Sequence, residues 1–263
     1  MSQWVLSGLK AGIKTSRYPR HREDAPGVTP GLPRARALGS PLSEEDLRLI
    51  DRCPTGALMR QGERIGVDPR RCVHCFRCAV EGLNAMPWEP SYEWAAATGS
   101  GSGSLGHPFS RSVNIRVVDA GDCGACLHEV KQLANPYYNL HRLGFFFTPT
   151  PRQADILVVV GPGADQMRSA LEKTLAAMPT PRVVIAVGTC ALSGGVFGPS
   201  FTCSDGVGSI VPVDIEVPGN PPPPLAILHA LLLATGRARS AAWRPGSNGL
   251  AEEPLAGDAE RNP

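Results

Sequence analysis

Residues 155–161 read DILVVVG, and residues 182–188 read RVVIAVG. Each is a continuous apolar run of strand length, the pattern of a strand buried on both faces of a parallel sheet. Between them, ADQMRSALEKTLAAM (164–178) has the apolar spacing of a helix that covers such a sheet. Strand, helix and strand in this order predict a doubly wound α/β fold.

The same alternation extends in both directions along the chain. SVNIRVVDA (112–120) predicts a strand, and a helical stretch follows at 125–143. PLAILHALLLATG (224–236) predicts a last helix, after a strand-like run that ends in Pro218-Gly219-Asn220. We therefore expect one doubly wound parallel sheet over residues 110–236.

The rest of the chain has a different composition, with many of its 29 glycines and 26 prolines. Residues 1–43 are rich in Pro and Arg and predict an irregular basic N-terminal arm. The Gly/Ser-rich stretch 95–109 predicts a flexible linker, and 237–263 a disordered tail. A small domain of residues 44–94, whose first helix is capped by Ser43, completes the expected organisation.

The N-terminal arm has an uneven charge. Between Lys10 and Arg22 the sequence contains five Lys or Arg and no acid. Such a block is either a solvated tail or an arm that lies against an acidic neighbour or an anionic membrane surface. The residues alone leave both interpretations open.

The overall composition excludes some functions. The 263-residue chain has a formal net charge of +2, too small to predict a nucleic-acid partner. It contains no apolar run of about 18 residues, so we expect no membrane-spanning segment. The first residues lack the apolar core of a signal peptide, which predicts a cytoplasmic protein. The eight cysteines are then expected to bind metal or to do redox chemistry rather than to form disulfides.

Four cysteines form a tight pattern in the small domain. CVHCFRC contains Cys72, Cys75 and Cys78, and Cys53 is followed directly by proline. Three cysteines spaced by two residues, with a distant Cys-Pro, are the ligand pattern of a bacterial ferredoxin. The half-motif of a second cluster is missing. The pattern predicts a ferredoxin-like α+β domain with one [4Fe-4S] cluster; His74, between two ligands, is expected at the surface.

A zinc site is the alternative for these four cysteines, because zinc also takes four thiolates, in tetrahedral geometry. Zinc sites more often pair two C-x2-C knuckles than a triple with a distant Cys-Pro. The spacing therefore favours the iron–sulfur cluster.

A second group of cysteines lies after the predicted strands. DAGDCGACLHEV places Cys123 and Cys126 after one strand, and AVGTCALSGG places Cys190 after another. In open α/β sheets, ligands bind beyond the carboxyl ends of the strands at the topological switch point. These loops could therefore converge on one cluster, and their glycines would let the backbone approach it closely.

The second domain resembles a known family. CGAC followed by Glu129, NLHRLGFFFTPTPRQADILVVVG, AAMPTPRVVIAVGTCALSGGVFG and GVGSIVPVDIEVPGNPPPP occur in the order of the 20-kDa-type subunit of complex I. The same order is found in small subunits of membrane-bound [NiFe] hydrogenases and formate hydrogenlyases. The spacing Cys123-x-x-Cys126 resembles the hydrogenase branch, since the complex I branch has adjacent cysteines.

This resemblance implies a flavodoxin-like domain that carries an electron-transfer cluster beside a large subunit. The implied partners are a hydrogenase-like or complex I 49-kDa-like large subunit and the membrane subunits of the same complex. The chain would then be a peripheral subunit on the cytoplasmic face of the inner membrane. It would act in an oxidoreductase without a catalytic site of its own.

The chain departs from the family at one ligand. The family turn reads Pro-Gly-Cys-Pro-Pro, and its cysteine is the fourth cluster ligand; here the position is Asn220. A neutral amide is a weak ligand for iron beside a thiolate. Cys203 could supply the fourth ligand to Cys123, Cys126 and Cys190. Otherwise the site holds an open-cornered or [3Fe-4S] cluster, or the cluster is lost and the domain remains a scaffold.

Four further features of the sequence bear on function. Glu129 is either an acid near the large subunit or an ordinary helix-start acid, and Arg152 matches a family arginine. GPGAD (161–165) lacks the residues of a phosphate loop, so no nucleotide is expected. The phenylalanines of GFFF (144–147) are expected in the core or at an interface.

Overall fold

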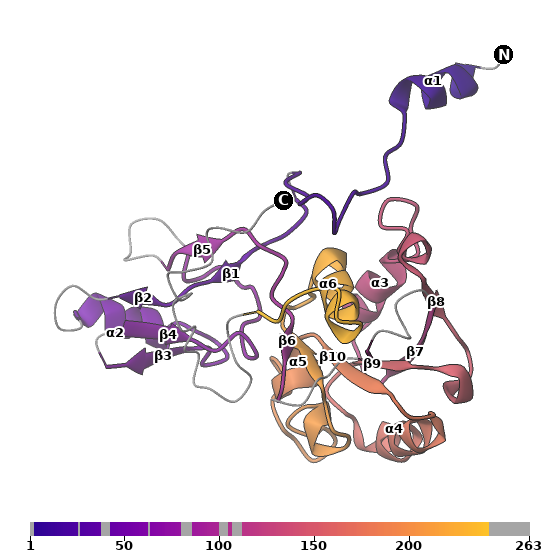
Figure 1. Cartoon of the computed structure of the whole chain (residues 1–263). Coiled ribbons are helices and arrows are strands. Elements are labelled where there is room, and N and C mark those ends of the chain that lie inside the picture. The colour runs from indigo at the N-terminus through magenta and orange to yellow at the C-terminus, as the bar shows by residue number, and fades with distance from the viewer. Residues whose placement is uncertain are drawn as a thin grey trace.

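The computed structural model describes residues 3–25, 27–37, 43–62, 64–79, 86–99, 105–106 and 112–241. A large part is built on a six-stranded sheet with helices on both faces, and a smaller part with short strands and one helix lies beside it (Figure 1). The N-terminal helix α1 projects away from both (Figure 1).

Five of the six strands of the large sheet run in the same direction. Its order is β6 (Ala96–Ala97), β11 (Ile215–Val217), β10 (Val183–Val187), β9 (Ile156–Val160), β7 (Val113–Asp119) and β8 (Phe145–Phe147). Strands β7 to β11 pair in parallel, and β6 joins the edge antiparallel. Counted along the chain, the parallel strands lie in the order 2-1-3-4-5, which is the flavodoxin-like arrangement with its switch point between β7 and β9.

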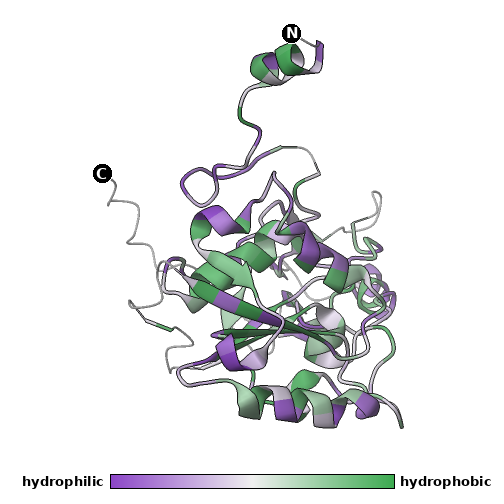
Figure 2. Ribbon diagram, turned by 90° about the vertical axis from the view of Figure 1, so that its right-hand side faces the viewer, coloured by the Kyte–Doolittle hydropathy of each residue, from purple (hydrophilic) through white to green (hydrophobic). Residues whose placement is uncertain are grey.

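Two apolar layers hold the helices to this sheet. Helices α3 (Ala125–Gln132) and α6 (Pro224–Ala234) share a core with alternate residues of the strands. Helices α4 (Asp165–Ala177) and α5 (Thr189–Ser193) pack with the intervening residues on the opposite face. Every residue of β9 and β10 is buried, because both faces are covered (Figure 2). The predicted α/β class is confirmed.

The smaller part contains α2 (Glu44–Asp51) and a three-stranded antiparallel sheet of β2 (Arg36–Ala37), β4 (Arg64–Val67) and β3 (Leu58–Gln61). A strand pair, β1 (Leu32–Pro33) with β5 (Trp88–Glu89), lies beside it. Ser43 caps α2 in a capping box with Asp46, as its sequence predicts. Leu49, Leu58 and Ile65 are buried between helix and sheet.

The helix expected over 125–143 is shorter in the structure. Helix α3 ends at Gln132, and a 3-10 turn, η2 (Leu140–Leu143), follows. Pro136 cannot donate a backbone hydrogen bond and disfavours a helical conformation at Asn135. The long helical prediction was wrong in its second half for this reason.

The N-terminal arm is only partly irregular. Residues Gln3–Ala11 form helix α1, and parts of 32–37 belong to strands of the smaller part. Between these elements, Ser16 and Tyr18 are buried, and the Ser16 amide donates to the Tyr137 carbonyl over 2.7 Å. Contacts such as those of Tyr18 make this segment part of the fold. Its high Pro and Arg content gives no indication of this in the sequence.

The expected linker is also partly structured. Residues Ala96–Ala97 form edge strand β6 of the large sheet, and Ala95 is buried. Ala241, in the expected tail, donates its amide to the Ala95 carbonyl over 2.9 Å. Residues 100–104, 107–111 and 242–263 lie outside the described residues. No helix in the part of the chain that is described is both long and apolar enough to cross a membrane.

Candidate metal centres

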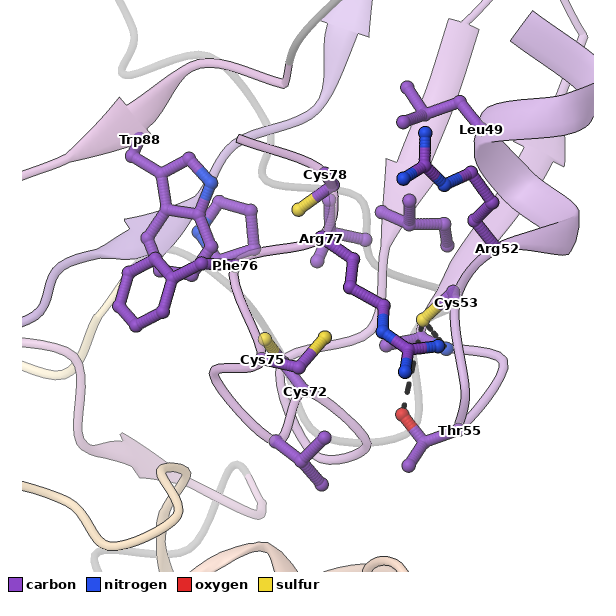
Figure 3. A pocket seen from close by; sticks show the side chains of 15 residues that line it. Leu49, Arg52, Cys53, Thr55, Cys72, Cys75, Phe76, Arg77, Cys78 and Trp88 are labelled. Atoms are coloured by element: carbon purple, nitrogen blue, oxygen red, sulfur yellow. Dashed lines mark hydrogen bonds between the residues drawn. The ribbon is translucent and has the colours of Figure 1, made fainter. Parts of the chain in front are cut away.

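The four cysteines of the small domain lie around one pocket. Cys53 follows the end of α2, and Cys72, Cys75 and Cys78 lie on the loop after β4. All four line the same pocket, whose other walls include Leu49, Leu58, Val67, Phe76 and Trp88 (Figure 3). The structure therefore brings together the ligand set that the sequence predicts for the first cluster.

The loop is shaped to turn its cysteines inward. His74 and Phe76, on either side of Cys75, have positive φ angles of 51° and 57°, which are uncommon for non-glycine residues. The Thr55 hydroxyl donates to the Arg71 carbonyl over 2.6 Å, and this bond holds the Cys53 turn against the loop. The Ala57 amide donates to Cys53 Sγ over 3.2 Å, and this bond orients the Cys53 side chain.

The electrostatics of this pocket suit bound metal. The pKa of Cys72 is raised to about 12, first by burial and then by the neighbouring cysteines Cys78, Cys53 and Cys75. Four mutually close thiols cannot all ionise unless a cation compensates their charge. A bound metal centre supplies this compensation, since a coordinating thiol is deprotonated.

Three cysteines meet at the carboxyl edge of the large sheet. Cys123 lies in the loop after β7 and is exposed, whereas Cys126 is buried in the first turn of α3. Cys190 is buried in α5, which follows β10. Burial raises the pKa of Cys126, and Asp122, Cys190 and Cys123 raise it further. The three thiols therefore lie close enough to influence one another, beside the switch point between β7 and β9.

Glycines allow the backbone to approach these sulfurs. A Cβ on Gly188 would lie 2.4 Å from Cys126 Sγ, and a Cβ on Gly195 would lie 2.7 Å from Cys190 Sγ. Both glycines have positive φ angles. A side chain at either position would occupy the space beside a sulfur, so the glycines form a cradle that fits a sulfur-ligated group.

The turn that contains Asn220 also lies beside the second group of cysteines. The Gly219 carbonyl accepts from the Thr189 amide over 2.8 Å, and it lies 3.6 Å from the Cβ position of Gly188. Half-buried Asn220 is the next residue. The family ligand position is therefore adjacent to the cysteine site, although its residue is an amide.

Cys203 has a different local environment. It is half-buried and forms an isolated antiparallel bridge with Ala164, the residue before α4. Its carbonyl accepts from the Ser200 amide over 2.9 Å. Cys203 as a fourth ligand stays a prediction.

The chain segments that carry the two groups of cysteines are in direct contact. The buried Thr189 hydroxyl donates to the Cys72 carbonyl over 2.9 Å, and Thr189 precedes Cys190. The Ser193 hydroxyl donates to the Arg70 carbonyl over 2.8 Å, and the Arg70 side chain donates to the Leu192 carbonyl over 3.1 Å. Helix α5 therefore lies against the loop that carries the first cysteine group.

Aromatic rings form a second connection. The His74 ring stacks against Trp94 with centroids 6.1 Å apart, and Trp94 Nε1 donates to the Pro218 carbonyl over 2.8 Å. Burial lowers the pKa of His74. The expected surface position of His74 was wrong, because two tryptophans, Trp88 and Trp94, lie against its ring. Sequence reasoning did not connect these residues, since their contacts are long-range.

No group of three or more His, Cys, Asp or Glu in the described ranges is placed to hold a single metal ion. The preference for a cluster over zinc at Cys53, Cys72, Cys75 and Cys78 therefore rests on the spacing of these cysteines in the sequence.

Glu129 and Arg152 lie outside these pockets. Glu129 is half-buried in α3, and burial raises its pKa. Arg152 is exposed on the 3-10 turn η3 (Pro151–Gln153). A functional role for either residue stays a prediction.

The doubly wound sheet with cysteines at its switch point defines a flavodoxin-like domain with a thiol-lined site. The chain belongs to the family described as NADH ubiquinone oxidoreductase, 20 Kd subunit, whose model matches residues 123–234. An uncharacterized protein of Methanocaldococcus jannaschii is 37% identical over 128 residues, 49% of this chain and 86% of the relative. Formate hydrogenlyase subunit 7 of Escherichia coli is 34% identical over 151 residues, 57% of this chain and 59% of that subunit.

Two solved structures are also similar. A chain of the membrane-bound sulfane sulfur reductase, an archaeal respiratory membrane complex, matches with a TM-score of 0.43 and 26% identity, over 48% of this chain and 71% of that chain. A chain of an NAD⁺-reducing [NiFe]-hydrogenase matches with a TM-score of 0.39 and 20% identity, over 48% of this chain and 93% of that chain. The family membership rests on the sequence matches.

Proposed function

We propose that this chain is an iron–sulfur electron-transfer subunit of a membrane-associated, hydrogenase-like or NADH–quinone-oxidoreductase-like complex. Family membership and the similarity to formate hydrogenlyase subunit 7 support a role within an oxidoreductase. The two groups of cysteines support the relay itself. A bound [4Fe-4S] cluster supplies one-electron chemistry, and the chain supplies its ligands and surroundings.

Cys53, Cys72, Cys75 and Cys78 would hold the first cluster. The pocket fits because its four thiols line one space whose walls combine apolar residues with Arg52 and Arg77, and because the Ala57 amide already donates to Cys53 Sγ. Hydrogen bonds to sulfur and the burial of the site are the properties through which a protein sets a cluster's reduction potential.

Cys123, Cys126 and Cys190 would hold a second cluster. The glycine cradle at Gly188 and Gly195 fits such a group, because it leaves space beside the sulfurs of Cys126 and Cys190. The fourth iron would be bound by Cys203 or left without a protein thiolate. Asn220 can lie beside the cluster without acting as a strong ligand.

The observation that carries the proposal is the hydrogen bond between Thr189 and the Cys72 carbonyl. It joins a ligand residue of the first site to the neighbour of a ligand residue of the second site through one buried 2.9 Å contact. Two redox centres held this way keep a fixed, short separation, which an electron relay requires.

The implied partners are a large hydrogenase-like or complex I 49-kDa-like subunit and the membrane subunits of the complex. Three exposed apolar side chains follow Cys190: Val196, Phe197 and Phe201. An exposed apolar patch beside a redox site suits a subunit interface. The chain would be held at the cytoplasmic face of the inner membrane through these subunits.

Site variants test the proposal in the full chain purified without oxygen. Cys75→Ser should remove one cluster, and Cys123→Ser should remove the other, each lowering the iron content by about four per chain. Zinc is measured in the same samples. Zinc in place of iron, or iron that does not respond to Cys123→Ser, contradicts the corresponding cluster assignment.

Asn220 favours a second candidate function, a docking scaffold that has lost the second cluster. In that case Cys123→Ser leaves the iron content unchanged while Cys75→Ser lowers it. The same pair of variants therefore separates the two functions.

A further inference from the structure

The N-terminal helix has an apolar surface that the rest of the described chain leaves uncovered. Helix α1 contains no buried residue, and its side chains Trp4 and Leu9 are 77% and 71% exposed. Ile13, two residues after the helix, is 93% exposed. The helix projects away from the folded body in both views (Figures 1 and 2).

The base of this helix is fixed to the body. The Thr15 hydroxyl donates to the Pro136 carbonyl over 3.0 Å, and the Ser16 amide donates to the Tyr137 carbonyl over 2.7 Å. Tyr18 is buried and meets the ring of Tyr92 edge-on at 5.2 Å. The exposed apolar residues therefore start from an anchored point.

A basic pocket lies directly at this base. Its lining includes Arg17, Arg20, His21, Arg142 and Arg237, together with Ile13. No described carboxylate forms an ion pair with any of these four arginines. The pocket thus carries positive charge that no ion pair within the described residues neutralises.

Two of these arginines are held by backbone carbonyls. Arg142 donates to Ser16 Oγ over 3.3 Å and also to the Tyr18 carbonyl. Arg237 donates to the Leu143 carbonyl over 2.8 Å, and its Nη2 is buried without a hydrogen-bond partner among the described residues. Glu23 lies nearby and accepts hydrogen bonds from the Arg17 amide and the Tyr137 hydroxyl. Burial lowers the pKa of Arg142, and the Glu23 charge partly offsets this shift.

We propose that α1 and this basic pocket together bind the surface of a bilayer that contains anionic phospholipid. Trp4, Leu6 and Leu9 would enter the interfacial layer, as the apolar residues of interfacial helices do. Lys10, Lys14 and the arginines of the pocket would meet the lipid phosphates, since the chain has no acid before Glu23. Apolar anchors beside basic groups that form no ion pair within the described residues are complementary to such a membrane and not to an uncharged one.

This contact differs from attachment through partner subunits, because the chain alone would make it. It also does not depend on the presence of either cluster. Loss of both clusters by Cys75→Ser and Cys123→Ser should leave lipid binding unchanged, so failure of one proposal is distinguishable from failure of the other.

Vesicle co-sedimentation of the full chain tests the proposal. We expect binding to vesicles of equimolar phosphatidylcholine and phosphatidylglycerol, weakening as NaCl rises, and no binding to phosphatidylcholine alone. Arg17→Ala with Arg20→Ala should lower the partition coefficient about 25-fold, because each basic residue near the surface contributes about five-fold. Trp4→Ala with Leu9→Ala should lower it by about ten-fold or more.

The matched control is Arg60→Ala with Arg64→Ala, which removes the same charge from exposed positions of β3 and β4. Circular dichroism checks that every variant is folded. No binding of the wild-type chain to anionic vesicles overturns the proposal, and so does an equal loss of binding in the control.

Discussion

Thr189 connects the two cysteine sites at the level of a single side chain. Its hydroxyl, 0% exposed, lies 2.9 Å from the Cys72 carbonyl and 3.1 Å from the Gly219 carbonyl. It therefore touches the first ligand loop and the turn that precedes Asn220. A residue of this kind is visible only in the fold, because its partners lie 117 and 30 positions away in the chain.

Thr189→Val should destabilise the protein. Valine has nearly the same shape but cannot donate, so it leaves the buried Cys72 carbonyl without this partner. We expect the free energy of unfolding to fall by about 1–3 kcal/mol in urea denaturation. Thr174→Val on α4, where the hydroxyl donates to the Ala170 carbonyl at an exposed position, should change it by about 0.5 kcal/mol or less. Equal effects of the two substitutions would contradict the role of Thr189.

Asn220 occupies the position at which the family supplies a thiolate. Asn220→Cys should restore a fourth ligand beside Cys126 and Cys190, because the turn already lies against α5. We expect slower loss of iron to a chelator, followed by absorbance, with little change in the cluster held by Cys53. If chelation proceeds at the same rate in both proteins, the second cluster is absent or already has a strong fourth ligand.

At the scale of elements, strand β11 joins the large sheet to the cysteine loop of the small part. Its Glu216 is 5% exposed and faces Arg70, with Oε2 and Nε 3.1 Å apart. The pKa of Glu216 is raised to about 7: burial is the largest cause and raises it, the Arg70 charge lowers it, and the Asp68 charge raises it. Burial outweighs the ion pair here, and neither of the two atoms has an aligned hydrogen bond within the described structure.

This arrangement predicts a pH dependence. The folded chain binds the Glu216 proton more tightly than the unfolded chain, so stability should fall as pH rises from about 4.5 to about 7. Glu216→Gln should remove this contribution, whose size is about 3 kcal/mol for a carboxyl shifted this far. Urea midpoints across this pH range measure the difference. Parallel pH profiles of the two proteins would show that Glu216 is not responsible.

Some helices and strands can be predicted from the sequence pattern and others cannot. Strands β9 and β10 and helices α4 and α6 follow from their apolar patterns, because burial on both faces or on one stripe determines the residues used. Strand β6 and helix α1 were missed. Two alanines beside Gly and Ser carry no strand signal, and β6 depends on pairing with β11. Helix α1 contains no buried residue, so burial within the described part of the chain does not shape its sequence.

The two cysteine sites also differ in how much of each can be predicted from the sequence. The first site follows from spacing alone, since Cys-Pro and the triple motif occur close together in the chain. At the second site, the positions of the cysteines after predicted strands identify them as candidate ligands. The glycine cradle and the contact through Thr189 depend instead on how loops after different strands converge. No local pattern contains that information.

At the scale of the whole molecule, the cysteine loop of the small part lies against helix α5 at the carboxyl edge of the large sheet. Helix α5 carries one cysteine and contacts the loop that carries three others. Helix α1 lies apart from this contact, so lipid contact and electron relay would use different surfaces (Figure 1). On the two proposals together, the molecule would combine two redox sites with a separate attachment point.

The iron content and electron paramagnetic resonance spectrum of the anaerobically purified full chain test the central claim most directly. The account predicts about seven or eight irons per chain and signals from two clusters, because both cysteine groups would be filled. About four irons with a signal from one cluster would contradict it.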